Sequence, residues 1–195
     1  MNIIESTIAE FMNCYEQGDH HGIARCTRTM SRIIKDKPEL FLETDPRKTY
    51  PLVMMVTECN MGEDAIAIAY YLVLKAYCNS VEFDDHEFLK TTLLMCITCI
   101  IEHYHALNAI LIRMHPRIPF YHLDCQIQSF YRKYVDYISY TEQEMLRSRV
   151  TNCCACGWID PIRSNEICNS SVKEYIADFE RYLKEIKIEK ESFLY

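Results

Sequence analysis

Thiol side chains crowd one short segment near the C-terminal end of the chain. Three of them lie within four residues and a fourth follows twelve positions later: Cys153, Cys154, Cys156 and Cys168. Four thiolates are enough to bind one structural zinc ion in a tetrahedron. The spacing differs from the paired C-x-x-C of most zinc knuckles, and the alternative is that these thiols pack as small apolar side chains beneath the loop that carries Trp158. The expected cofactor is therefore one structural zinc, or none.

A second set of potential ligands follows a helical spacing. Cys96, Cys99 and His103 are separated by three and four residues, which places them on one stripe of a helix. Because the surrounding residues are almost all apolar, this stripe is expected to pack against another helix. A thioredoxin-type redox pair would need a preceding strand and a helix that begins at the motif, whereas these cysteines lie in mid-helix.

Cationic side chains gather on one predicted helix in the first fifth of the chain. Offsets of three, four and three residues align Arg25, Arg28, Arg32 and Lys35 on one face. The opposite face carries the apolar residues Cys26, Met30, Ile33 and Ile34. The basic face is the predicted binding site for an acidic partner or for phosphate groups, and the alternative is an ordinary solvated helix face.

No recognisable catalytic motif accompanies these features. The sequence contains no nucleophile elbow, no Walker loop and no H-E-x-x-H pair, and its seven histidines fit none of these patterns. The carboxylates beside His20 and His86 stand at predicted helix starts, where acids cap the helix and meet its positive dipole end. No catalytic residue is predicted, and the chain is expected not to be an enzyme.

The overall composition is that of a folded protein. The chain has 195 residues, of which 49% are hydrophobic, and a formal net charge of -7. A negative net charge disfavours a general nucleic-acid-binding surface, so a protein partner is favoured over nucleic acid. Eleven cysteines, an odd number, predict free thiols and an intracellular protein, cytoplasmic or nuclear. The longest uncharged apolar run, residues 91–101, is shorter than the ~20 residues that cross a bilayer, so no membrane contact is expected.

Glycine is scarce, and this bears on the fold class. Four glycines are few for the phosphate loops and hairpin turns of α/β and all-β proteins. The accompanying excess of isoleucine and tyrosine is typical of AT-rich coding, such as that of large DNA viruses. Apolar residues recur at three and four positions along most of the chain. An all-α, single-domain irregular bundle of seven to eight helices is predicted.

The expected organisation is a helical body over residues 1–150, a Cys-rich loop over 151–170 and an amphipathic helix over 171–195 that packs on the body. Helices are predicted near residues 4–17, 20–36, 51–59, 63–80, 85–115, 119–138 and 171–186, with a surface loop at 43–48. The fifth of these is expected to be one long helix or two joined near His103. A weak repeat at an offset of 45 residues leaves a short HEAT- or armadillo-like stack of helix pairs as the alternative architecture.

Two functions from different classes follow from these features. The favoured one is a non-enzymatic helical adaptor or regulator that binds another macromolecule, because most of the sequence forms amphipathic helices and no catalytic motif is present. The alternative is a zinc-binding regulatory protein, of gene expression for example, that uses the Cys-rich loop.

Overall fold

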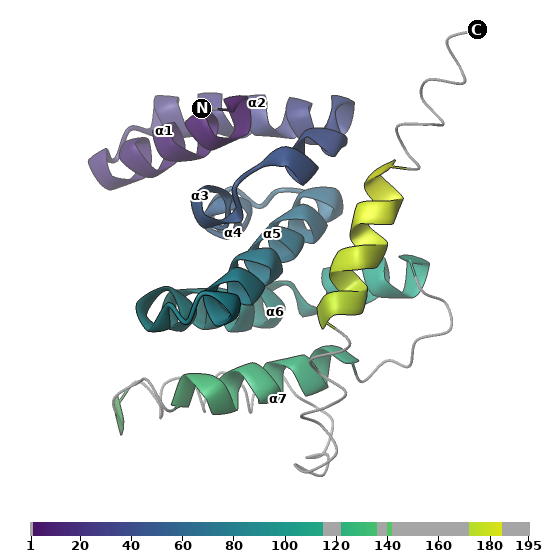
Figure 1. The fold of residues 1–195 in the computed structure, drawn as a ribbon. Helices are drawn as coiled ribbons and strands as arrows, with labels where there is room; N and C mark the ends of the chain where they lie inside the picture. Colours follow the sequence, from purple (N-terminus) through teal and green to yellow (C-terminus); the bar gives the residue numbers. More distant parts are fainter. Residues whose placement is uncertain (1, 115–121, 136–139, 142–171, 185–195) are drawn as a thin grey trace, which may run out of the picture. The chain divides into compact units, whose positions relative to one another are not determined.

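The computed structural model describes residues 2–114, 122–135, 140–141 and 172–184. Helices account for 89% of these residues and no strand occurs among them, which confirms the all-α prediction. The labelled elements are α1 (Ile3–Gln17), α2 (His20–Asp36), η1 (Pro38–Glu43), α3 (Pro46–Thr49), α4 (Leu52–Glu58), α5 (Glu63–Glu82), α6 (His86–Met114) and α7 (His122–Val135). A further helix covers residues 172–184 and is drawn in yellow in Figure 1.

The contacts within the chain gather in two compact units. The first unit comprises residues 1–76 and 176–195, and the second comprises residues 77–175. Both boundaries fall inside helices, namely α5 and the helix over residues 172–184. Neither helix contains glycine or proline, so no change of composition marks the boundary in the sequence.

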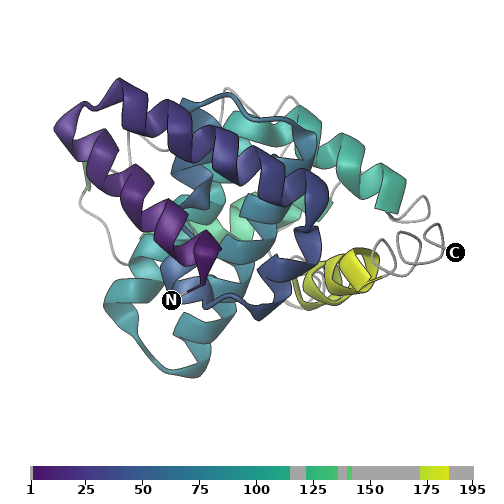
Figure 2. The ribbon, with the colours of Figure 1, turned by 90° about the horizontal axis from the view of Figure 1, so that it is seen from above.

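Helices α1 and α2 form a hairpin in the first unit and run side by side (Figure 2). The Asn2 side chain accepts a hydrogen bond from the Ile4 amide and begins α1. Gly18 ends α1 in the left-handed conformation, with φ 68°. The Asp19 carboxylate then accepts hydrogen bonds from the amides of His21 and Gly22 and begins α2. These local caps explain why the predicted boundaries of both helices are correct.

The predicted surface loop at residues 43–48 is partly wrong. The short helix α3 begins inside it, because the Asp45 carboxylate accepts a hydrogen bond from the Arg47 amide at 2.9 Å. Pro46 occupies the first helical turn, where its missing N–H leaves no hydrogen bond unmade. An aspartate followed by proline is thus a helix start as well as a loop signal.

Helix α5 is buried over ten consecutive residues, 65–74, as its apolar composition predicts. It extends to Glu82, two residues past the predicted end at residue 80. Asp85 caps α6 by accepting a hydrogen bond from the Phe88 amide at 3.1 Å. The sequence left open whether α6 is one long helix or two helices joined near His103, and both alternatives hold in part. The helix runs to Met114, but His103 has a non-helical conformation, with φ -121° and ψ 22°.

The offset repeat does not correspond to equivalent helix pairs. It would match α1 and α2 with α4 and α5, but α1 has 15 residues and α4 only seven. Aspartates at the two matched helix starts also differ in role, since Asp19 caps α2 whereas Asp64 lies in the first turn of α5. These differences favour the irregular bundle over the stack of helix pairs.

One described helix is long and apolar enough to cross a membrane by length and composition. It is the part of α6 over His86–Ile110, which contains an 18-residue window with a mean hydropathy of 1.4. Central helices of globular proteins meet the same criterion, and 39% of this window is buried within the protein. The expected absence of membrane contact therefore stays a prediction.

Candidate interaction surface on helix α2

The four basic residues predicted as a site are all exposed on α2. With about 100° of rotation per residue, Arg25, Arg28, Arg32 and Lys35 fall within an arc of about 80° and extend over about 15 Å. The opposite side of the helix is anchored in the first unit by Cys26 and Met30, which are 1% and 0% exposed. The structure therefore presents these four cations on a helix whose orientation is held by its buried side. We call them the basic face.

The members of the basic face differ in what they contact. Arg25 forms an ion pair with Glu10 of α1, with Nη2 and Oε1 2.5 Å apart and both side chains exposed. The Nε of Arg28 donates a hydrogen bond to the Ala24 carbonyl oxygen at 3.2 Å, one turn earlier in the same helix. Part of the charge of Arg25 is thus already balanced within the hairpin. The pairing with Glu10 has no signal in the sequence, because it depends on how α1 packs on α2.

The basic face stands out against the charge of the whole chain. Residues 20–37 contain five of the 21 lysines and arginines and only one of the 28 acidic residues. The chain as a whole carries a formal net charge of -7. A local excess of positive charge on an acidic protein steers negatively charged segments to that place and not to the rest of the surface.

The cysteine and histidine stripe of α6 lies in the interior of the second unit. Cys96 and Cys99 are 0% exposed, and burial raises the pKa of the Cys99 thiol to about 12. Burial also lowers the pKa of the half-buried His103. Thiols with raised pKa values are poor nucleophiles and poor metal ligands at neutral pH. No cluster of metal-binding side chains occurs in the part of the chain that the structure describes.

The predicted zinc ligands Cys153, Cys154, Cys156 and Cys168 lie outside the described residues. If they bind zinc, purified protein is expected to carry about one equivalent of the metal by elemental analysis. Chelation should then accelerate proteolysis near Trp158 and shift thermal unfolding little, because the packed helices have their own core. Freshly reduced protein without zinc would contradict this prediction, and the thiols would be packing residues.

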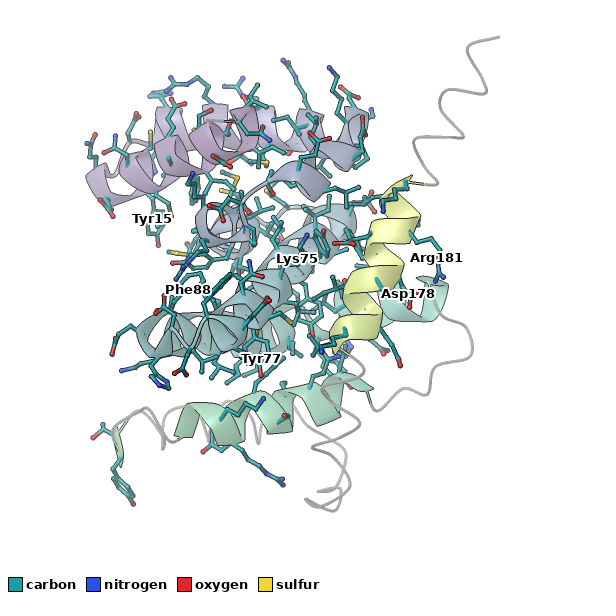
Figure 3. All side chains as sticks on the ribbon, viewed as in Figure 1. Tyr15, Lys75, Tyr77, Phe88, Asp178 and Arg181 are labelled. Atoms are coloured by element: carbon teal, nitrogen blue, oxygen red, sulfur yellow. The ribbon has the colours of Figure 1, made fainter. Side chains whose placement is uncertain are left out.

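A cluster that the sequence did not reveal joins α5 to the helix over residues 172–184. The hydroxyl of Tyr71 donates to Glu180 Oε1 at 3.0 Å, and Lys75 Nζ donates to both partners at 3.1 Å. Lys75 lies beside this helix, and Asp178 and Arg181 lie on its other side (Figure 3). Burial and the nearby Glu180 carboxylate raise the pKa of Tyr71 well above its ordinary value, so its hydroxyl stays protonated.

The pKa of Glu180 reflects two opposing effects. Burial by itself raises it, but hydrogen bonds from Lys75 and Tyr71 outweigh burial, and the net pKa is lowered. A protonated phenol between a lysine and a carboxylate supports the position of a helix but supplies neither an acid nor a base near neutral pH. The cluster is therefore a structural one. Lys75 and Glu180 are 105 positions apart in the sequence, which explains why no local pattern predicts the cluster.

Comparison with known proteins adds no relative to this description. No protein-family model matches the chain, and neither the curated proteins nor the solved structures contain a significant match to it. The basic face of α2 is accordingly characterised by its own geometry and charge.

Proposed function

We propose that this chain is a non-enzymatic helical adaptor or regulatory protein that binds an acidic segment of another macromolecule through the basic face of α2. The observation that carries the proposal is the exposure of Arg25, Arg28, Arg32 and Lys35 together on a helix anchored by its opposite side. An anchored helix pays little conformational entropy to present its side chains to a partner.

A protein segment fits this surface better than a nucleic acid does. Three of the four cations are arginines, and guanidinium groups form two parallel hydrogen bonds with carboxylates and with phosphates alike, so the length of the face and the charge around it decide between the two partners. The face is about 15 Å long, which suits about three turns of a short acidic helix. Tight binding to a duplex depends on contacts with many phosphates, and the acidic remainder of the chain would repel the rest of the backbone.

Charge reversal tests the proposal. The variant Arg28→Glu, Arg32→Glu, Lys35→Glu is expected to bind a fluorescent glutamate-rich peptide about 10- to 100-fold more weakly than the original chain, by fluorescence anisotropy at low salt. Arg25 is left in place because its reversal would put two carboxylates against each other at Glu10. The fold should be unchanged, because exposed helix charges each contribute only a few tenths of a kcal/mol to stability.

A matched control separates local from overall charge. The variant Arg47→Glu, Lys173→Glu, Lys184→Glu changes three exposed cations elsewhere and alters the net charge equally. It should bind the peptide with nearly the original affinity at moderate salt, where distant exposed charges are screened. Equal losses in both variants, or none in the α2 variant, would refute the proposal. Tighter binding of a DNA duplex than of the peptide would favour a nucleic-acid partner instead.

A further inference from the structure

The turn between α5 and α6 combines exposed apolar side chains with a dense negative charge. Val81 is 51% exposed and Phe83 is 68% exposed. Four of the seven residues from Val81 to Glu87 are acidic, namely Glu82, Asp84, Asp85 and Glu87, and none is a lysine or arginine. We call residues 81–87 the acidic turn. An exposed phenylalanine among carboxylates offers a cationic partner both an aromatic anchor and charges of opposite sign.

Local hydrogen bonds hold the acidic turn in one conformation. The Phe83 amide donates to the Asn79 carbonyl at 3.0 Å, and the Asp85 amide donates to the Ser80 carbonyl at 3.0 Å. Asp84 stands between them at φ 52°, a left-handed conformation that glycine usually adopts at a helix end. The Asp85 side chain is occupied as the cap of α6. Val81, Glu82, Phe83, Asp84 and Glu87 are all exposed to solvent on this hydrogen-bonded turn.

The surface of this chain that complements the acidic turn is the basic face of α2. Carboxylates of the turn match the guanidinium groups of Arg28 and Arg32, and an exposed phenylalanine ring is a stacking partner for arginine. The aliphatic stems of arginine and lysine also cover apolar side chains such as Val81. The same chain therefore carries both halves of a charge-complementary contact.

We propose that the acidic turn of one molecule docks on the basic face of α2 of a second copy of this chain. This inference rests on the proposed function, because it names the acidic segment that the basic face binds. Each copy has one acidic turn and one basic face, so the contact joins two different surfaces. A pair of molecules therefore keeps one unoccupied turn and one unoccupied basic face. Such contacts build rings when the rotation closes and open chains when it does not.

The first test measures mass against concentration by sedimentation velocity. At about 50 mM salt the weight-average mass should rise with protein concentration, and at about 500 mM salt it should fall back toward that of the monomer. Phe83→Ala and Asp84→Gly should each weaken the association, the second while keeping or improving the fold because glycine fits the left-handed conformation. A monomer at every concentration and salt would overturn the inference.

Charge complementation gives the decisive test. Glu82→Lys, Glu87→Lys leaves two cations and two carboxylates on the turn, and Arg28→Glu, Arg32→Glu leaves two of each on the α2 face, so each variant has one surface without net charge. Each variant alone should be largely monomeric, because its unchanged surface then lacks a partner of opposite charge. An equimolar mixture should associate again, because the first variant keeps the basic face and the second keeps the acidic turn. A mixture that stays monomeric, or single variants that associate like the original chain, would refute docking between these surfaces.

A control and a binding assay distinguish this inference from the proposed function. Glu16→Lys, Glu58→Lys changes two exposed carboxylates elsewhere and should leave the association intact. If the original chain stays monomeric but its basic face still binds the glutamate-rich peptide, the second copy is excluded and the proposed function stands. If the peptide is not bound either, both fail.

Discussion

Replacing Phe179 by alanine is expected to release the C-terminal helix from α5 and to lower stability by about 3–5 kcal/mol, the usual cost of truncating a buried aromatic side chain. Phe179 is 1% exposed, and its ring stacks on that of Tyr71 with centroids 4.8 Å apart. The neighbouring hydrogen bond from Tyr71 to Glu180 depends on the same packing of this helix against α5. Urea unfolding followed by circular dichroism measures the loss.

The matched control for this variant lies on the same helix. Tyr182 is 42% exposed and its ring centroid lies 6.2 Å from that of Phe179, so Tyr182→Ala should lower stability by only about 1 kcal/mol, because less buried surface is lost than in Phe179→Ala. Hydrogen exchange over residues 176–183 should accelerate much more in Phe179→Ala than in Tyr182→Ala. Equal effects of the two substitutions would show that the helix is not held by its buried face.

Replacing Gly22 by alanine is expected to lower stability by about 2–3 kcal/mol, although alanine normally stabilises a helix by up to about 1 kcal/mol over glycine. A Cβ at this position would lie 2.3 Å from Cys14 Sγ and 2.5 Å from Asp19 Oδ2. Cys14 is buried, and Asp19 is the cap of α2, so neither atom moves without a cost. Losing such a cap alone costs about 1 kcal/mol. Thermal unfolding of the variant tests this expectation.

Two further variants identify the cause. Cys14→Ala removes the nearer of the two clashing atoms, so Gly22→Ala should cost about 1 kcal/mol less in that background than in the original chain. Ala24→Gly, an exposed position in the same helix, should follow ordinary helix propensity and cost about 0.5–1 kcal/mol. A Gly22→Ala variant that is more stable than the original chain would contradict the close approach of α1 and α2.

Much of the helical framework is predictable because its signals are local. Asp19 and Asp85 cap the helices that follow them, and Gly18 ends α1, each through hydrogen bonds that span a few residues. The shared exposure of Arg25, Arg28, Arg32 and Lys35 is predictable for the same reason, since spacing alone determines which residues of a helix share a side. Asp45 shows the limit of such local prediction, because an aspartate followed by a proline is found both in loops and at the start of helices.

The sequence by itself thus determined most of the helix boundaries, the caps at Asp19 and Asp85, and which four cations share one side of α2. Only the tertiary structure decided that Glu10 balances Arg25, that Gly22 must lack a side chain, and that Tyr71, Lys75 and Glu180 form one cluster. It also decided that α5 is shared between two compact units. The physical reason is the distance along the sequence between the residues that interact. Caps and helix faces depend on neighbours within a few residues, whereas ion pairs and close approaches depend on how distant helices pack.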